Sequence, residues 1–370
     1  MVKPVYLTNL SALRIFFATG IVFFHLPAWT QLQRSVYAEY LFLFNDGFFC
    51  LSGYLMFHIF FTRAQVSDWR KDVFRRFRTF YPLHFLMLCV WTLVSISESH
   101  LARFFGLEHA EGGSNSLMNF LKNLVFIQGW RINSEYSFNH PAWAFSALLL
   151  CYIIARLIFL TRNKLLVAAI SVTIASISFA YMISSGAVSA QSFFIPRVFL
   201  GFFLGGIFGL MSRLFEPNRI IIVFFSLCSV VYVIFIFRYF GDNASFFTAP
   251  SICILIWLIA RKRGVILFKP TLEARLIYLD RLTFPLMITH SLPVILMEHL
   301  CILMFNGPTE KLRGTKYIEL SNIQGLCFIL TTFLLCYVFA ALLRQLIENY
   351  IGRNQFAKNW KGTIARLIKV

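Results

Sequence analysis

Long apolar stretches alternate with short polar connections along the whole chain. About 20 apolar residues cross the hydrocarbon core of a bilayer, and ten stretches approach that length. They cover residues 10–29, 40–61, 78–97, 142–161, 165–184, 192–212, 219–237, 244–260, 282–304 and 323–343. The pattern predicts an all-α protein, a polytopic transmembrane bundle of about ten helices, with residues 1–343 as a single membrane-embedded domain. A further apolar stretch, Leu117–Trp130, is too short to span easily, so we expect it to lie in the interface or to re-enter.

Composition agrees with a membrane protein, and charge predicts its orientation. Of the 370 residues, 58% are apolar and 14% are charged, whereas a soluble domain averages about 25% charged residues. The net charge of +18 could indicate nucleic acid, but the basic residues form short clusters between apolar runs. With both termini cytoplasmic, the inner loops carry about three times as many Lys and Arg residues as the outer loops, which is the usual bias. We therefore expect cytoplasmic termini, a basic tail (344–370) on the anionic inner leaflet, membrane lipid as a partner and no nucleic acid.

Several familiar chemistries have no support in the sequence. The eight cysteines all fall within apolar runs and show no CxxC spacing, so they are predicted to be small core residues and not disulfides or metal ligands. The chain also lacks HExxH, Gly-x-Ser-x-Gly and a glycine-rich phosphate loop. Zinc-dependent and serine-nucleophile hydrolase mechanisms are therefore disfavoured, and we expect no metal and no bound cofactor.

The first apolar run carries two polar side chains on one face. Arg14 and His25 are eleven residues apart, so on a helix they point within about 20° of each other and lie about 16 Å apart. An arginine within such a segment costs roughly 2.5–3.5 kcal/mol, which calls for a partner or a function. The plainer alternative is an Arg14 that snorkels to the cytoplasmic edge and a His25 that hydrogen-bonds a neighbouring helix.

The second run begins with Asn45-Asp46-Gly47-Phe48-Phe49-Cys50-Leu51-Ser52-Gly53-Tyr54. Asp46 is expected at roughly the depth of His25, where its carboxylate could orient the imidazole as a general base. The alternative is that Asp46 caps the second helix at the interface. Ser52 and Gly53 are small enough to allow close helix packing, which we regard as their main role.

A basic cluster precedes the third run. Residues Arg70–Arg78 include six charged residues in nine positions, five of them basic, interleaved with phenylalanine. Guanidinium groups match phosphate oxygens bidentately and stack on planar rings. Arg75, Arg76 and Arg78 could therefore hold the phosphates of a cytoplasmic acyl-CoA, and anionic lipid head groups are the competing ligand.

Three further polar or aromatic positions lie within or at the ends of later runs. Trp143 follows Pro141-Ala142 at the start of the fourth helix, Arg197 follows Pro196 at the start of the sixth, and His290 is expected in the middle of the ninth. Intramembrane His and Arg residues are functional candidates. We assign Ser52, Trp143, Arg197 and His290 to acceptor binding or to structure.

These motifs together resemble the acyltransferase 3 family of membrane acyltransferases. The resemblance rests on Arg14 and His25, on Asp46-Gly-Phe-Phe-Cys-Leu-Ser-Gly-Tyr54 and on Arg75-Arg-Phe-Arg78, with looser support from Pro141-Ala-Trp143 and Ile288-Thr-His290. It extends over nearly the whole chain. One departure is Leu148, where the family often has a glutamate, so that acid is absent or supplied by another residue such as Glu135 or Asp46.

The resemblance implies an enzyme of the bacterial inner membrane that moves an acyl group from cytoplasmic acyl-CoA to a sugar hydroxyl. The co-substrate is acetyl-CoA or, second, succinyl-CoA, and the acceptor is a polysaccharide or lipid-linked oligosaccharide of exopolysaccharide or O-antigen type. Arg75, Arg76 and Arg78 would hold the donor phosphates, and Arg14 would meet the pantetheine end or a phosphate. His25 would remove the hydroxyl proton or carry the acyl group, with Asp46 beside it.

Two other functions remain open on the sequence. A transporter or flippase for a glycan precursor would move its substrate unchanged and would tolerate loss of the basic cluster. An acyl-CoA-responsive membrane scaffold would bind through the same cluster and would tolerate loss of His25.

Overall fold

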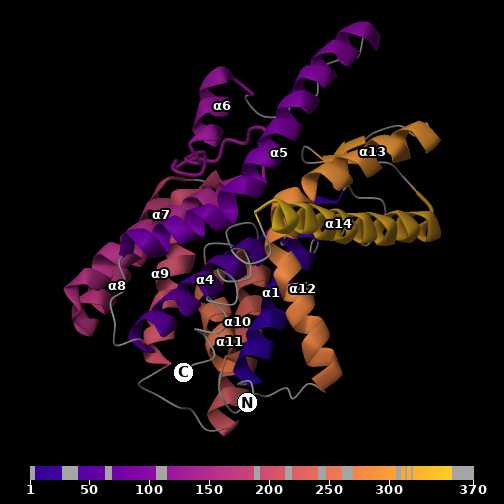
Figure 1. Ribbon diagram of the computed structural model, residues 1–370. Coiled ribbons are helices and arrows are strands. Elements are labelled where there is room, and N and C mark those ends of the chain that lie inside the picture. The colour runs from indigo at the N-terminus through magenta and orange to yellow at the C-terminus, as the bar shows by residue number, and fades with distance from the viewer. Residues whose placement is uncertain are drawn as a thin grey trace.

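The structure is a computed structural model that describes residues 5–26, 41–62, 69–105, 115–186, 192–212, 219–240, 247–260, 270–305, 310–312, 315–317 and 320–351. Its helices are α1 (Val5–His25), α4 (Leu43–Thr62), α5 (Trp69–Phe105), α6 (Leu117–Leu124), α7 (Ala142–Ile158), α8 (Lys164–Ser184), α9 (Ile195–Met211), α10 (Arg219–Phe240), α11 (Thr248–Ile259), α12 (Pro270–Thr289), α13 (Ser291–Phe305) and α14 (Asn322–Ile351), with one 3-10 turn, η1 (Phe159–Thr161). Two short strands, β1 (Glu310–Leu312) and β2 (Thr315–Tyr317), pair antiparallel. Helices dominate the described chain, which confirms the predicted all-α class (Figure 1).

Each of the ten apolar runs contains a helix that makes up most of its described residues. By length and composition, four stretches within α5, α7 with η1, α8 and α14 can each cross a membrane, and the bent pair α12–α13 makes a fifth if it is one span. The count of ten spans and the cytoplasmic termini stay predictions. The predicted tail begins inside α14, which continues to Ile351, and its remainder, 352–370, lies outside the described residues.

The run at 282–304, predicted as one helix with His290 in its middle, is broken. It divides at His290 into α12 and α13, which are bent by 62°. Pro293 supplies the physical reason, because proline has no backbone N–H and its ring clashes with the carbonyl four residues earlier, which is that of Thr289. His290 therefore lies at a break between two helices and not in the middle of one.

Helices α4 and α9 pack backbone to backbone through glycine. A Cβ on Gly53 would lie 1.8 Å from the carbonyl oxygen of Phe202, and one on Gly205 would lie 2.1 Å from that of Cys50. No side chain fits at either position, so only glycine allows this approach. The packing role predicted for Gly53 is confirmed. The Ser52 hydroxyl instead donates to the Phe48 carbonyl of its own helix at 2.8 Å.

Helix α1 packs beside α12, and α14 runs across the upper end of this pair (Figure 1). The Phe333 ring of α14 stacks on Phe23 of α1 with the ring centres 6.2 Å apart. One turn further along α14, the Tyr337 hydroxyl lies 2.8 Å from the Thr19 hydroxyl. The middle of α14 therefore closes one side of the space beside the end of α1.

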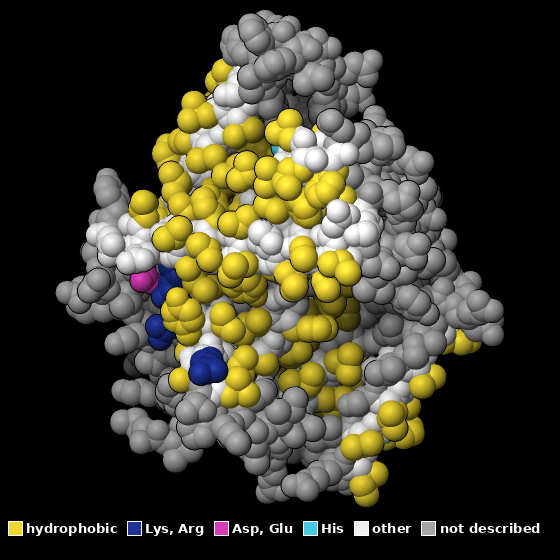
Figure 2. All heavy atoms as spheres, turned by 90° about the vertical axis from the view of Figure 1, so that its right-hand side faces the viewer, with side chains coloured by type: hydrophobic (Ala, Val, Ile, Leu, Met, Phe, Trp, Pro, Cys, Tyr) yellow, Lys and Arg dark blue, Asp and Glu magenta, His cyan; other side chains and the backbone are white. Residues whose placement is uncertain are grey.

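The outer surface has the character of a lipid-facing protein. Figure 2 shows hydrophobic side chains spread over the face to which α13 and α14 contribute. Large exposed apolar side chains on these two helices are Leu296, Leu300, Leu303, Met304, Ile323, Leu326, Leu330, Leu334, Val338, Leu342 and Leu346. A soluble monomer rarely exposes so continuous an apolar surface, so this face is expected to lie against lipid.

Helix α6 is apolar on the outside and polar on the inside. Leu117, Met118 and Leu121 are exposed, whereas Asn119 and Asn123 are buried. The inward side is held to α5, where the Tyr81 hydroxyl donates to the Leu124 carbonyl at 2.8 Å. An inverted amphipathic helix of this kind agrees with a segment that lies in or re-enters the membrane.

Candidate active site

His25 is the last residue of α1, and a backbone carbonyl fixes its ring. Nδ1 lies 2.8 Å from the Ile21 carbonyl oxygen, one turn earlier in the helix. A carbonyl only accepts hydrogen bonds, so the neutral imidazole carries its proton on Nδ1 and its lone pair on Nε2. The side chain is partly exposed. Nε2 can therefore act as a base or as a nucleophile.

Two more imidazoles lie beside His25. The His290 ring centre is 4.9 Å away and that of His140 is 5.6 Å away. They come from different elements, because His290 lies at the α12–α13 break and His140 lies in the loop before α7. No group of three or more His, Cys, Asp or Glu side chains within the described ranges could hold a metal ion. The cluster is thus a set of three neighbouring imidazoles that can hold and pass protons.

The loop before α7 adds an aromatic ring to this cluster. Tyr136 lies with its ring centre 3.8 Å from that of His140. Burial, and then the charge of His25, lower the pKa of His140 to about 3, so this ring is neutral at ordinary pH. Burial also raises the pKa of Tyr136, which keeps its hydroxyl protonated.

The structure corrects the predicted role of Asp46. Arg197 donates from Nε to one carboxylate oxygen of Asp46 at 2.6 Å and from Nη2 to the other at 3.3 Å, and the same Nη2 also donates to the Phe42 carbonyl at 2.8 Å. Both charged side chains are buried. A buried carboxylate pairs with a guanidinium far more strongly than with a neutral imidazole. Asp46 and Arg197 therefore join α4 to α9, and the Ile21 carbonyl orients His25 instead.

Arg14 has a carboxylate partner on the neighbouring helix. Its Nη2 lies 2.8 Å from an oxygen of Asp280 in α12, and the Ser11 hydroxyl donates to the same oxygen at 2.9 Å. The side chain of Asp280 is only 2% exposed. Two polar contacts thus join α1 to α12 and to the break that follows it, the ion pair at one level and the His25–His290 contact about three turns higher. The predicted shared face of Arg14 and His25 is confirmed, and it is the face that meets α12.

The basic cluster lies on the first turns of α5 and is tied to neighbouring side chains. Arg75 lies 3.6 Å from Asp72, which also pairs with Arg156 of α7 at 2.8 Å. The guanidinium of Arg78 lies over the Phe74 ring, with 5.8 Å to the ring centre. Arg75 is half-buried and Arg78 is exposed. The cluster thus forms a surface with more basic than acidic groups.

Arg76 points inward from the same turn. Its guanidinium lies 3.8 Å over the ring centre of Tyr152 in α7, and its Nη2 lies 3.4 Å from the sulfur of Met56 in α4. Tyr152 is ten residues from Ala142, the first residue of α7, a distance of about 15 Å along the helix. The basic cluster and the three imidazoles therefore lie toward opposite ends of α7.

Comparison with known proteins decides the family. The family model described as an acyltransferase domain matches residues 7–343, which includes every residue of the site described above. The chain belongs to the acyltransferase 3 family. No curated protein and no solved structure matches it. The resemblance inferred from the motifs is thus confirmed, and the protein is a membrane acyltransferase.

In this acyltransferase, Trp143 is a packing residue. Its ring stacks on Phe194 with the centres 4.2 Å apart and the planes 7° from parallel, and it is 6% exposed. Leu148 is 1% exposed within the same core. Of the two acids considered as substitutes, Asp46 pairs with Arg197, and Glu135 accepts hydrogen bonds from Arg131 and Asn119 outside α7. The contacts of the described residues therefore give neither acid a place beside Leu148.

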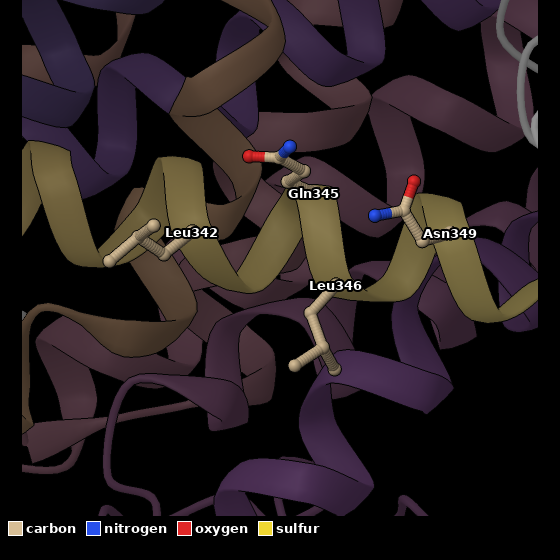
Figure 3. Close-up of a pocket in the computed structure, with 4 residues that line it drawn as sticks. All are labelled: Leu342, Gln345, Leu346 and Asn349. Atoms are coloured by element: carbon tan, nitrogen blue, oxygen red, sulfur yellow. The ribbon is translucent and has the colours of Figure 1, made fainter.

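The structure also contains a shallow groove that lies apart from this site. It has a volume of about 660 Å³ and is lined by Leu342, Gln345, Leu346 and Asn349 of α14. Gln345 and Asn349 project from one side of the helix and Leu346 from the other (Figure 3). Contact between α14 and the end of α1 is made by Phe333 and Tyr337, more than one turn before the groove begins.

Sequence reasoning missed two residues of the site, Asp280 and His140. Asp280 stands in Ile277-Tyr278-Leu279-Asp280-Arg281-Leu282, just before the predicted start of its span at 282. An acid within an apolar stretch requires a partner, and Arg14 was the unpaired cation, so charge pairing could have found it. His140 directly precedes the Pro141-Ala-Trp143 motif, but nothing in the sequence places that loop beside the end of α1.

Proposed function

We propose that this acyltransferase transfers an acyl group from cytoplasmic acyl-CoA to a sugar hydroxyl of a cell-surface polysaccharide or lipid-linked glycan. Acetyl is the first candidate for the group and succinyl the second, and the bacterial inner membrane is the proposed location. The observation that carries the proposal is the fixed tautomer of His25. Its Nε2 lone pair is presented at the end of α1, where proton transfer or acyl transfer can take place.

The basic cluster supports an acyl-CoA donor. Half-buried Arg75 and exposed Arg78 lie one turn apart on α5, where a pyrophosphate would compete with Asp72 for Arg75. Arg76 and the Tyr152 ring give the inner wall of this surface a cationic and an aromatic face. The distance along α7 from this surface to His25 is one that an extended pantetheine chain can bridge, so the thioester would reach the imidazoles while the phosphates stay at the arginines.

The proposed reaction requires one base and no net proton uptake. His25 Nε2 removes the proton from the acceptor hydroxyl while that oxygen attacks the thioester carbonyl carbon. The C–O bond forms, the C–S bond breaks, and the proton passes from His25 to the departing thiolate. In the other route, Nε2 attacks the thioester first and carries the acyl group to the hydroxyl. Both routes use the same lone pair.

The test is the acyl content of the purified surface polysaccharide, measured by proton NMR. Wild type, a deletion strain, and His25→Ala expressed to the wild-type level are compared. The proposal expects the acetyl or succinyl signals to disappear in the deletion and in His25→Ala. Polymer that is absent or mislocalised with unchanged acylation would instead indicate a transporter, and normal acylation by His25→Ala would remove His25 from the reaction.

A further inference from the structure

His290 occupies a position that the fold makes unusually rigid. It is the residue at which α12 and α13 meet, and its own backbone stays hydrogen-bonded on both sides, from its N–H to the Leu286 carbonyl and from the Val294 N–H to its carbonyl. On α14, the Cys336 thiol donates to the same carbonyl at 3.7 Å. The ring is fully buried. A residue held from three helices cannot move far from His25.

The ring of His290 has one nitrogen satisfied and one without a partner. Nδ1 lies 3.1 Å from the carbonyl oxygens of both Leu286 and Met287, so in the neutral ring it is the protonated nitrogen. Nε2 is buried and has no hydrogen-bond partner among the described residues. A buried acceptor without a partner is costly, and in native structures such an atom meets a ligand, an ordered water or a group that takes part in a reaction step.

We propose that His290 is a positioning residue, whose Nε2 accepts a hydrogen bond from His25 when His25 holds the proton of the acceptor hydroxyl. The proposal rests on the proposed function of His25. Before the reaction, both Nε2 atoms are acceptors and do not bond to each other. Removal of the hydroxyl proton turns His25 Nε2 into a donor, and the two rings, with centres 4.9 Å apart, are close enough for that bond.

The groups around the pair support this assignment. Among the described residues, the titratable side chains beside His25 and His290 are His140 from the loop before α7, Tyr136 behind it, and Cys336 from α14. His140 is neutral at ordinary pH. The charge of Arg197 acts on Tyr136, and Arg197 is itself paired with Asp46. The Arg14–Asp280 ion pair lies about three turns further down α1 and α12. The buried lone pair of His290 is therefore well placed to stabilise a positive charge on His25.

The proton balance of the step is simple. The O–H bond of the acceptor breaks, the proton stays on His25 with His290 as its hydrogen-bond acceptor, and it then leaves with the thiolate of coenzyme A. His290 starts and ends the cycle neutral.

The experiment compares His290→Asn and His290→Leu in the purified, membrane-reconstituted protein, with transfer from labelled acetyl-CoA or succinyl-CoA measured from pH 5 to 9. Asn keeps an acceptor oxygen, and Leu fills the space without one. We expect His290→Leu to lower kcat roughly 100-fold with KM for the donor unchanged, and its acid limb to move to lower pH, because a protonated His25 loses its acceptor. We expect His290→Asn to retain activity within roughly tenfold of wild type.

His299→Gln is the matched control. His299 lies on α13, makes the same Nδ1 contact with a carbonyl one turn earlier at 2.8 Å, and is exposed away from the site. It should behave as wild type. The proposal would be overturned if His290→Leu had the kcat and the pH profile of wild type. It would also be overturned if His290→Leu and His290→Asn lost the same fraction of kcat while the acid limb of the pH profile did not move. His25→Ala distinguishes the two claims, because activity in that variant refutes the proposed function, whereas its loss together with an active His290→Leu refutes this inference alone.

Discussion

The ion pair between Arg14 and Asp280 allows stability and activity to be separated. Its carboxylate is 2% exposed and its guanidinium side chain is 21% exposed. Removal of one partner from a buried pair leaves an uncompensated charge and costs roughly 3–5 kcal/mol, whereas apolar replacement of both is often neutral. The lower end of that range applies here, because the guanidinium retains some solvent.

Three variants are compared: Arg14→Met, Asp280→Leu, and the double variant that carries both substitutions. We expect each single variant to lose roughly 3 kcal/mol of unfolding free energy and the double variant to lose roughly 1 kcal/mol, which gives a coupling of several kcal/mol between the two positions. Unfolding in detergent can be followed with a thiol-reactive dye, because Cys50, Cys151 and Cys253 are buried in the folded protein.

Activity of the double variant then tests the role of Arg14. If Arg14 also meets the donor, the double variant is stable and inactive. If Arg14 only pairs with Asp280, activity returns together with stability. The Arg344–Glu348 pair within α14 is the control, because a pair four residues apart on one helix contributes under about 1 kcal/mol. Single losses below about 1 kcal/mol, or a double variant that loses the sum of both, would refute the reasoning.

Three other predictions follow from the geometry. Gly205→Leu should prevent α4–α9 packing and abolish folded protein in gel filtration, because a Cβ there meets the Cys50 carbonyl. Arg75→Ala with Arg78→Ala should raise KM for acyl-CoA roughly tenfold or more in initial-rate assays, because the proposed phosphate contacts are removed. Between pH 6.5 and about 3, His140 is protonated in the unfolded chain and neutral in the folded protein. Lowering the pH over this range therefore lowers the free energy of unfolding, by at most about 1.4 kcal/mol per pH unit. The melting temperature of His140→Gln should then fall less with decreasing pH than that of wild type.

Each of these has a contrary outcome. A folded Gly205→Leu protein would mean that α4 and α9 are further apart than described. An unchanged KM in the Arg75→Ala, Arg78→Ala variant would assign the basic cluster to lipid. Lys164→Ala, a change at the start of α8, is the control and should leave KM for acyl-CoA unchanged. An equal acid sensitivity of His140→Gln and wild type would show that His140 is solvated in the folded protein.

The helices were predictable because an apolar run of about 20 residues in a membrane protein forms a helix. The coincidence of α1 with its run, and the common face of Arg14 and His25, follow from helical periodicity alone. The length of Leu117–Trp130 likewise argues against an easy span, and its helical part, Leu117–Leu124, is short.

The partners of the charged residues were not predictable, because pairing depends on which helices are neighbours. Asp46 was assigned to His25 from depth alone, and Arg197 competes for it from a helix 151 residues away. Asp280 is 266 residues from Arg14. The break at His290 had a signal in Pro293, but proline within apolar helices does not always bend them by as much as 62°.

The measurement that tests the central claim most directly is label transfer by the purified protein in lipid vesicles. Radiolabelled acetyl-CoA or succinyl-CoA is supplied with de-acylated surface polysaccharide from the source cells, and wild type is compared with a folded His25→Ala variant. We expect label to enter the polysaccharide as an alkali-labile ester with wild type and to fall at least about 100-fold with His25→Ala. Equal transfer by both proteins, or transfer by neither while unmodified glycan crosses the vesicle membrane, would contradict the account.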